Sequence, residues 1–343
     1  MKIHEKYMQR CLQLAKNGRV HAMPNPSVGA VIVYNGNIIG EGYTSSYGRA
    51  HAEVNAIASV KNPELLAHAT IYVSLEPCSH FGKTPPCADL ILKHKIPMVV
   101  VGASDPNPLV AGNGLRKIAD SGAQVISGIL EKECIESNIR FFTFHQKKRP
   151  YIILKWAQSK DGFIAPTSEK RNQNPEPFWI TNTYSRQLVH KWRSEEAAIL
   201  IGTQTAIDDN PKLDVRDWIG ANPVKIVLDQ KNRIPKENYI FEDKSKVKVL
   251  TSTEIDFGKN PAQQIAQYLY NVGLQSVIIE GGRQTLQTFI DAGIWDEARV
   301  FTGEVLFGEG MKAPEFSGSQ PIKQSVLQDE LLIFKNHDQH NYF

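Results

Sequence analysis

The sequence has little of several features that would narrow its class at once. Of its 343 residues only four are cysteines, and no apolar run approaches the roughly 20 residues that a helix needs to span a bilayer. The net charge of +3 is small, and 22% charged with 41% hydrophobic residues is typical of a globular protein. These features argue against a membrane protein, a disulfide scaffold, a disordered chain and a nucleic-acid-binding protein.

The N-terminal segment, MKIHEKYMQR, lacks the apolar core of a secretory signal, so we expect a cytoplasmic protein. In that reducing compartment, paired cysteines bind metals or take part in chemistry more often than they form disulfides. The basic cluster Lys147–Arg149 is better explained as part of a linker than as a nucleic-acid-binding patch. The length of the chain favours two domains.

Hydrophobic periodicity predicts alternating helices and strands in the first part of the chain. A helix over residues 3–15 precedes a hairpin at Ala30–Gly42, in which Asn35 and Gly36 form the turn. The pattern then predicts a helix at 50–60, a strand at 70–77, a helix at 85–95 and a strand at 97–103.

A polar, basic connector is predicted around Thr143–Pro150, and a second series of elements follows it. Strands are predicted at 151–157, 197–202, 224–229, 247–252, 276–282 and 298–307, and helices near 183–196, 261–271 and 285–292. A loop rich in Asn, Pro and Glu is expected at 166–177. We therefore predict two different α/β domains, residues 1–147 and 148–343.

The stretch PCSHFGKTPPC (Pro77–Cys87) becomes informative when it is combined with an earlier His-Ala-Glu. Imidazole and thiolate are zinc ligands, and a catalytic zinc takes three protein ligands and leaves a fourth position for water. His51, Cys78 and Cys87 provide such a set. Zinc lowers the pKa of bound water towards ~7. Glu53, two residues from the ligand His, can take the proton of that water and pass it to a departing amine.

Alternatives to a catalytic zinc remain open at this point. His80 could complete four ligands around a structural zinc, or the residues could bind no metal. The zinc deaminases of nucleobases have H-x-E followed by P-C-x-x-C, whereas eight residues separate the two cysteines here. The Pro context of the cysteines favours the catalytic interpretation.

Four segments together resemble the deaminase half of the bifunctional riboflavin-biosynthesis deaminase–reductase family. They are MPNPSVGAV, HAE, EPCSHFGKTPPC and SDPNPLVAGNG. The resemblance implies a cytidine-deaminase-like three-layer αβα domain, with zinc on the three residues above and Glu53 as proton shuttle. It implies that the pyrimidine or its ribose phosphate contacts Asn25, His80, Lys83, Asp105 and Asn107.

The second half of the chain resembles the reductase half of the same family, through RPYIILKWAQSKDGFIA, WITNTYSRQLVHKWR, ILIGTQTAIDDNPKLDVR and EGGRQTL in that order. The resemblance implies a dihydrofolate-reductase-like α/β domain that uses NADPH. It places Lys155 near the reacting ribose. It implies substrate contacts from Arg193, Leu213, Arg216 and Glu280. It implies cofactor contacts from Ala157, Trp179, Thr205, Asp209, Gly281, Gly282, Arg283, Gln284, Thr285 and Leu286.

The residue types are consistent with these roles. Arginine binds phosphate through two parallel hydrogen bonds, and glycines where a strand meets a helix let backbone N–H groups approach an anion. The looser glycine motif GEGMKA is followed by Pro314, so we interpret it as a turn. Either Lys155 or Glu280 could provide the proton that accompanies hydride transfer.

The chain departs from the family at three positions. Thr44 occupies the place of a His seven residues before the zinc-ligating His, Pro177 replaces a small polar residue, and Ala197 replaces a common Asp. The missing His removes an expected substrate contact, and Pro177 puts a contact with a substrate hydroxyl in question.

The sequence thus predicts a bifunctional enzyme, a zinc aminohydrolase joined to an NADPH-dependent oxidoreductase. Its substrate would be a phosphoribosylaminopyrimidine, with no nucleic-acid or membrane partner, and we expect a homo-oligomer, with a dimer favoured. Three other hypotheses remain: a tRNA or nucleoside deaminase with an RNA-binding second domain, a non-catalytic protein that keeps zinc for stability, and a reductase without deaminase activity.

Overall fold

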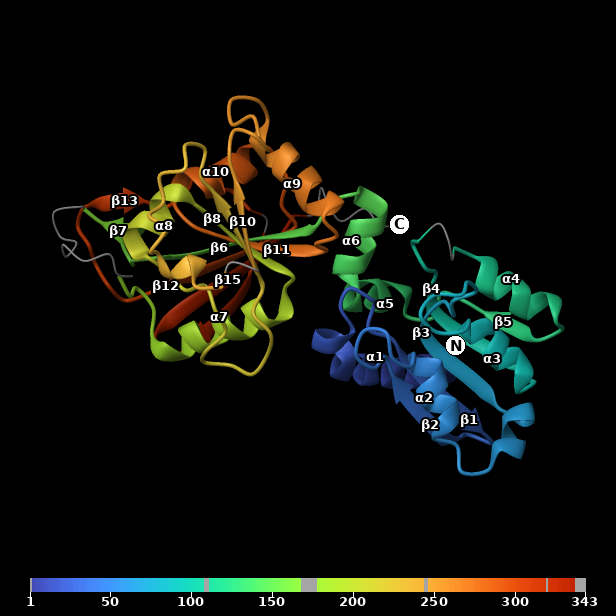
Figure 1. Cartoon of the computed structure of the whole chain (residues 1–343). Helices are drawn as coiled ribbons and strands as arrows, with labels where there is room; N and C mark the ends of the chain where they lie inside the picture. The colour runs from blue at the N-terminus through green and yellow to red at the C-terminus, as the bar shows by residue number, and fades with distance from the viewer. Residues whose placement is uncertain (1, 108–110, 168–177, 244–245, 319, 337–343) are drawn as a thin grey trace. The chain divides into compact units, whose positions relative to one another are not determined.

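The computed structural model describes residues 2–107, 111–167, 178–243, 246–318 and 320–336. The chain forms two compact units, Met1–Lys148 and Arg149–Phe343 (Figure 1). Among the described residues, no helix combines the length and the apolar character needed to cross a membrane.

The first unit is built on a mixed β-sheet in the order β2-β1-β3-β4-β5. β1 is antiparallel to both of its neighbours, and β3, β4 and β5 are parallel. The strands are β1 (Gly29–Tyr34), β2 (Asn37–Tyr43), β3 (Thr70–Leu75), β4 (Met98–Ala103) and β5 (Gln124–Ile126). The helices are α1 (Lys2–Ala22), α2 (Ala52–Ala58), α3 (Cys87–Lys93), α4 (Asn113–Asp120), α5 (Glu131–Ser137) and α6 (Ile139–Lys147).

Helices cover both faces of this sheet, as predicted for a three-layer αβα domain. α1 packs on β1 and β3 next to α5, whereas α2 packs on β1 and β2 next to α3. Two glycines permit the close approach. A side chain at Gly29 would meet the backbone of Cys11 in α1, and one at Gly42 would meet the backbone of Ala52 in α2 at 2.4 Å. Gly42 therefore fixes the place of α2, which begins beside the zinc-ligand candidates.

The hairpin and the first helix confirm the predictions from the sequence. Asn35 and Gly36 have positive φ values of 48° and 76°, as a tight turn between two strands requires. α1 is longer than the predicted helix and ends at Ala22. Its buried face includes Cys11, which is fully buried as expected for a structural residue.

The polar connector predicted around Thr143–Pro150 was mostly wrong. Residues up to Lys147 continue α6, and Thr143 is fully buried, with its hydroxyl donating to the carbonyl of Ile139 at 2.8 Å. The helix also buries Phe142. The basic residues Lys147–Arg149 suggested a linker, although Lys147 is the last residue of the amphipathic helix and Arg149 is buried in the second unit.

The second unit contains a larger mixed sheet in the order β10-β9-β8-β11-β6-β12-β15-β14. The strands from β10 to β12 are parallel, and β15 and β14 are antiparallel additions. They are β6 (Tyr151–Gln158), β8 (Ala198–Gly202), β9 (Val224–Leu228), β10 (Val247–Leu250), β11 (Ser276–Glu280), β12 (Glu297–Thr302), β14 (Ile322–Val326) and β15 (Asp329–Lys335). β7 (Phe163–Pro166) and β13 (Gly310–Lys312) form a separate pair.

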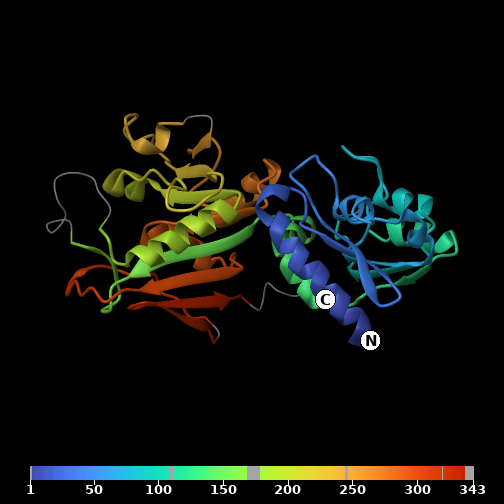
Figure 2. The same ribbon diagram turned by 90° about the horizontal axis from the view of Figure 1, so that it is seen from below.

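The helices of this unit are α7 (Thr183–Glu195), α8 (Thr203–Asp209), α9 (Pro261–Asn271) and α10 (Arg283–Asp291). α9 and α10 bury Leu269 and Phe289 in the main core, against residues of β6, β8 and β11. α7 lies across the opposite face of the sheet (Figure 2). There Trp192 stacks on Phe301 of β12. Helices on both faces of a largely parallel sheet agree with the predicted dihydrofolate-reductase-like class.

A buried ion pair stands at the beginning of the second unit. Arg149 donates two hydrogen bonds to Asp296, at 2.5 and 2.8 Å, and Asp296 is fully buried. The same carboxylate accepts the backbone N–H of Ile152 in β6 at 2.8 Å. This arrangement attaches the first residue of the unit to the segment that precedes β12.

Candidate active sites of the two units

The predicted zinc ligands converge in the structure. His51 immediately precedes α2, Cys78 follows β3, and Cys87 is the first residue of α3. Nδ1 of His51 lies 3.6 Å from the Sγ of Cys78 and 3.4 Å from that of Cys87, and all three donor atoms lie within 4.8 Å of one another. A tetrahedral zinc with ordinary bond lengths separates sulfur from nitrogen ligands by roughly 3.5 Å, so the residues fit the ion.

The loop between β3 and α3 favours an anionic sulfur. The backbone N–H of Cys87 donates to the Sγ of Cys78 at 3.3 Å, and the N–H of Ala88 donates to the Cys78 carbonyl at 3.1 Å. Hydrogen bonds from Cys87 and His51, opposed by burial, lower the pKa of Cys78. A lowered thiol pKa favours the thiolate, which is the form that binds a cation.

Glu53 lies in the first turn of α2, with only 4% of its surface exposed. Burial, together with the charge of Cys78, raises the pKa of this carboxyl to about 7, and it shares a hydrogen bond with Cys87. A carboxyl with such a pKa can accept and release a proton near neutrality. The metal-ligand cluster of the described residues has three members, and the exposed His80 is not among them. This favours the catalytic over the structural interpretation.

The orientation of His51 depends on a residue that the sequence analysis did not single out. The hydroxyl of Thr84 lies 3.4 Å from Nε2 of His51, on the side of the ring opposite the two sulfurs. Ligating histidines are usually oriented through such a contact of the second ring nitrogen. Thr84 belongs to the insertion between the two cysteines, which therefore contributes to the site.

A second unanticipated residue, Glu76, connects the zinc-ligand loop to the segment that follows β4. Its carboxylate is 4% exposed and accepts three backbone N–H groups, from Asp105 at 3.3 Å, Gly112 at 3.0 Å and Gly114 at 3.1 Å. Asp105 in turn accepts the N–H of Asn107 at 2.8 Å. Burial raises the pKa of Asp105 to about 6, with the charge of Glu76 acting in the same direction and the hydrogen bond from Asn107 opposing the shift.

The remaining candidates of the first unit lie on loops. Asn25 is half-buried just after α1, and Lys83 is exposed with its ammonium 4.0 Å from the centre of the Tyr47 ring. Thr44, which replaces the expected His, is buried, and its hydroxyl accepts the N–H of Val28 at 2.9 Å. The hydroxyl of Thr44 thus has a structural role, as the acceptor of this hydrogen bond.

In the second unit, the predicted residues gather around one cavity of about 790 Å³. The predicted residues that line it are Lys155, Ala157, Trp179, Arg193, Thr205, Asp209, Leu213, Arg216, Glu280, Gly281, Gly282, Arg283, Gln284 and Thr285. The side chain of Leu286 is instead fully buried in the hydrophobic core below α10. The departure at Pro177 lies outside the described residues. At the departure at Ala197, the backbone N–H donates to the hydroxyl oxygen of Ser276 at 3.0 Å.

A cluster of three charged side chains forms one wall of the cavity. Arg193 donates to Glu280 at 2.9 Å, and the ammonium of Lys155 lies 3.9 Å from the same oxygen. Burial alone would raise the pKa of Glu280, but the charges of Arg193 and Lys155 lower it to about 2. Burial also lowers the pKa of Lys155. Buried Nε of Arg193 and Oε1 of Glu280 lack a hydrogen-bond partner among the described residues.

Two strand-to-helix junctions form another wall. β8 runs into α8 at Gly202, and the neighbouring β11 runs into α10 at Gly282, and neither helix has a side-chain cap. The N–H of Gly282 donates to Thr205 at 2.8 Å, which joins the junctions. Uncapped helix starts at the carboxyl ends of parallel strands are suited to phosphate groups.

A three-donor site with a buried carboxyl in an αβα domain, followed by a separate α/β domain with a large cavity, defines the class: a zinc-binding deaminase domain joined to a reductase-type domain. Two family models agree. The cytidine and deoxycytidylate deaminase zinc-binding region matches residues 1–103, and the RibD C-terminal domain matches residues 150–337.

Known relatives cover almost the whole chain. The riboflavin biosynthesis protein RibD of Aquifex aeolicus is 36% identical, over 97% of this chain and 98% of its own length, and that of Actinobacillus pleuropneumoniae is 36% identical over 93% and 88%. The structure resembles the Thermotoga maritima diaminohydroxyphosphoribosylaminopyrimidine deaminase/5-amino-6-(5-phosphoribosylamino)uracil reductase, with a TM-score of 0.85 and 34% identity over 97% of this chain and 99% of that one.

Acinetobacter baumannii RibD gives the same TM-score of 0.85 at 32% identity, again over 97% and 99% of the two chains. The chain belongs to the RibD family of bifunctional riboflavin-biosynthesis enzymes. It is therefore both a deaminase, which is a hydrolase, and a reductase, and it contains a zinc-binding deaminase domain.

Proposed function

We propose that residues 1–147 hydrolytically deaminate a diamino-hydroxy-phosphoribosylaminopyrimidine and that residues 148–343 reduce the ribosyl group of the resulting aminouracil to ribityl with NADPH. The name of the Thermotoga maritima relative contains both reactions. The observation that carries the proposal is the buried carboxyl of Glu53 beside the three donor atoms of His51, Cys78 and Cys87.

In the deaminase reaction, a zinc ion held by the three donors would supply a water molecule acidified towards neutral pH. Glu53 would take a proton from the attacking water as the new C–O bond forms at the amine-bearing carbon. It then delivers the proton to the nitrogen as the C–N bond breaks and ammonia leaves. One carboxyl can do both because Glu53 is buried beside the three donor atoms and is not itself one of the ligands.

Substrate binding in the first unit is assigned to Asn25, His80, Lys83, Asp105 and Asn107. Glu76 supports this assignment. It lies two residues before the zinc ligand Cys78 and accepts hydrogen bonds from the backbone of the segment that contains Asp105. Lys83 carries the positive charge that a phosphate or a polar ring edge would contact. Thr44 takes no part, since its hydroxyl is bonded to Val28.

In the reductase reaction, NADPH supplies the hydride. Lys155 is the residue that we propose as proton donor to the reduced substrate. The low pKa of Glu280, about 2, keeps that carboxylate ionised near neutrality and leaves it no proton to give. Glu280 orients the ammonium and, with Arg193, Leu213 and Arg216, binds the substrate. The buried, unpartnered atoms of Arg193 and Glu280 would be satisfied by hydroxyl groups of the ribose.

The walls of the cavity other than the cluster of three charged side chains are suited to binding a dinucleotide. The uncapped N–H groups in the first turn of α10, which begins at Arg283, can contact the diphosphate, and the half-exposed ring of Trp179 offers an apolar surface. We propose cofactor contacts from Ala157, Trp179, Thr205, Asp209 and the segment Gly281–Leu286. The last residue would contribute through its backbone, because its side chain lies in the core.

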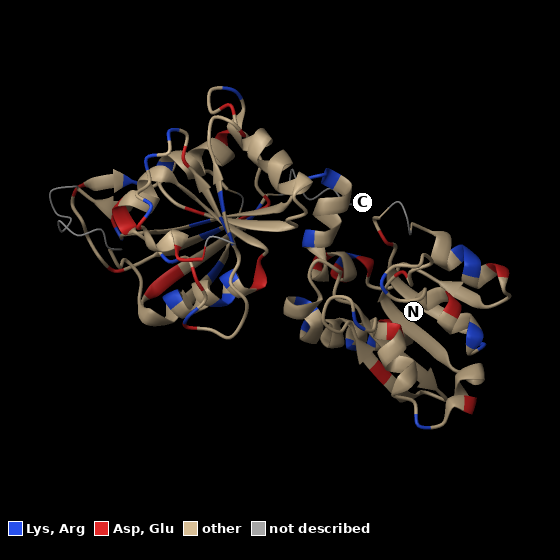
Figure 3. Cartoon of the chain, in the orientation of Figure 1, with Lys and Arg blue, Asp and Glu red and all other residues tan. Residues whose placement is uncertain are grey.

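We further propose a cytoplasmic homodimer that acts on a small molecule without a nucleic-acid or membrane partner. Lys and Arg residues are interspersed with Asp and Glu over the described elements of both units, which favours a small ligand over a polyanion (Figure 3). Retention of the purified protein on an RNA column, or a monomeric mass by light scattering, would contradict the respective parts.

The decisive experiment is a metal assay on the purified protein coupled to two activity assays with the pathway substrate. We expect one zinc per chain, release of ammonia, and then oxidation of NADPH in the same amount. Ammonia release with no oxidation of NADPH would restrict the proposal to the first unit. Zinc without either activity would support a structural role for the metal.

A further inference from the structure

His190 is a buried imidazole on α7, 3% exposed, and it lines the cavity of the second unit. Nδ1 lies 3.0 Å from the carbonyl oxygen of Asp214, and Nε2 lies 3.3 Å from a carboxylate oxygen of Asp217. A carbonyl oxygen only accepts hydrogen bonds, so Nδ1 carries the proton in the shorter contact. Burial and the charges of Arg193 and Arg216 lower the pKa of His190, which favours this neutral form near pH 7.

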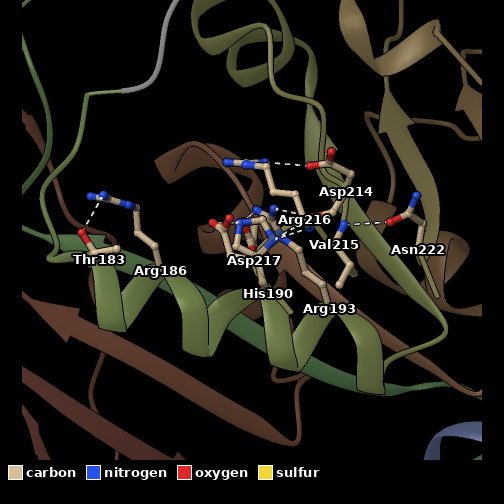
Figure 4. A network of polar contacts seen from close by, with 10 residues as sticks. Thr183, Arg186, His190, Arg193, Asp214, Val215, Arg216, Asp217 and Asn222 are labelled. Atoms are coloured by element: carbon tan, nitrogen blue, oxygen red, sulfur yellow. Dashed lines mark hydrogen bonds and ion pairs between the residues drawn. The ribbon is translucent and has the colours of Figure 1, made fainter. Parts of the chain in front are cut away.

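The segment opposite His190 carries two of the proposed substrate contacts. Figure 4 shows His190 and Arg193 extending from the same side of α7 towards Asp214 and Arg216. Arg193 shares the Asp214 carbonyl with His190, at 3.3 Å, and the amide nitrogen of Arg216 lies 3.4 Å from Nδ1 of His190. The imidazole is thus placed between the two arginines without bonding to either guanidinium.

The backbone of this segment needs to be held in place. Leu213, which is 3% exposed, has a φ of 51°, in the left-handed region that residues other than glycine and asparagine rarely adopt. Further along, a side chain at Gly220 would come within 2.4 Å of Cβ of Ser194 on α7. The N–H of Val215 donates to Asn222 at 2.7 Å, which closes the segment on itself. Its fit against α7 therefore leaves little freedom.

We propose that His190 is a positioning residue of the reductase site. By donating to the Asp214 carbonyl, it fixes Leu213 and Arg216 relative to Arg193 and so prepares the surface that binds the anionic end of the substrate. His190 does not touch the reacting carbon, and Asp217 provides a second attachment when the ring is protonated. This inference rests on the proposed function for the identity of the bound substrate.

Three substitutions of His190 separate positioning from simple packing. The side-chain amide of Asn reproduces the place of Nδ1, and that of Gln reproduces the place of Nε2. We expect His190→Ala to raise the KM for the aminouracil substrate about tenfold, the effect of losing one buried hydrogen bond, with a kcat changed by less than about threefold. His190→Asn should restore most of the KM, and His190→Gln should not. The Kd of NADPH should stay the same in all three.

The matched control is Gln187→Ala, an exposed position on the same helix, which should change neither constant. Hydrogen exchange of the substrate-free protein gives an independent result: amides of residues 213–217 should exchange faster in His190→Ala and at the original rate in His190→Asn. Equal rates in all variants, or rescue by Gln rather than Asn, would overturn the inference.

The experiments distinguish a failure of the proposed function from a failure of the role proposed for His190. If the proposed function is wrong, the unsubstituted protein will not oxidise NADPH with the aminouracil, but the exchange experiment still reports on His190. If only the inference is wrong, the unsubstituted protein and His190→Ala will have the same KM. A loss of kcat at constant KM would also contradict it, because that result would indicate a role in the chemical step.

Discussion

Glu280 accepts a hydrogen bond from Arg193 at 2.9 Å and faces Lys155 across 3.9 Å through the same carboxylate oxygen. Glu280 ends β11 and pairs in register with Lys155 on the parallel strand β6. The sheet therefore brings together two charged residues that lie 125 positions apart, at the edge where the glycine junctions begin. The order of the strands, more than any local motif, creates this site.

This cluster predicts a dependence of stability on pH. The pKa of Glu280 falls from the ordinary 4.5 to about 2 on folding, so its contribution is complete above about 4.5 and is lost as pH falls towards 2. A shift of this size is on the order of 3 kcal/mol. Urea unfolding should show Glu280→Gln less stable than the unsubstituted protein at pH 6, with the difference roughly halved at pH 3. A difference that is independent of pH would contradict the assignment.

Substitution of Glu53 tests the proton transfer. We expect Glu53→Gln to lower the rate of ammonia release by about 10²–10⁴-fold, because the amide cannot carry the proton. Zinc content should not change, since Glu53 is not in the ligand cluster. Oxidation of NADPH with the already deaminated substrate should also be unchanged. Normal ammonia release would show that Glu53 is not the proton carrier.

Substitution of Glu76 tests the attachment of the Asp105 segment. Glu76→Gln places an amide NH₂ against at least one of three backbone N–H donors, and leaving a buried donor unsatisfied costs about 1–3 kcal/mol. We expect a KM for the deaminase substrate raised about tenfold, with zinc retained. The exposed Glu64 provides the control, and Glu64→Gln should leave the KM unchanged. Equal KM values for the two variants would remove Glu76 from the site.

The ion pair of Arg149 and Asp296 should contribute strongly to stability. Asp296→Asn leaves the guanidinium buried without its counter-charge, for which we expect a loss of about 3–5 kcal/mol in the free energy of unfolding of the second unit. The comparison is Glu41→Gln, which breaks the more exposed pair with Arg10 and should cost less than about 1 kcal/mol. Similar losses in the two variants would refute the distinction.

The sequence was most informative where structure depends on neighbouring residues. The Asn35–Gly36 turn and the helix Pro261–Asn271 were predicted because turn residues and a proline at the first helical position have local effects. The ligand set was predicted from residue types whose chemistry is specific to metals. The short α8 and the paired strands β7 and β13 lacked a distinct periodic signal and were missed.

Glu76, Thr84 and His190 could not be assigned from the sequence, because their roles depend on contacts formed only in the fold. Glu76 bonds to groups 29 to 38 positions away, and His190 bonds to a carbonyl 24 positions away. A buried Glu after an apolar strand was the one available signal, since such a group requires partners. The sequence gives no indication of which backbone amides provide them.

The buried Arg149–Asp296 pair also determines where the chain can be cut. The match to the RibD C-terminal domain begins at residue 150, one position after the arginine. A recombinant reductase half that started at Pro150 would retain the buried carboxylate of Asp296 but lack Arg149, the residue that neutralises its charge. Such a fragment should express poorly or melt early, whereas one extended by a few residues towards the N-terminus should behave as an independent enzyme.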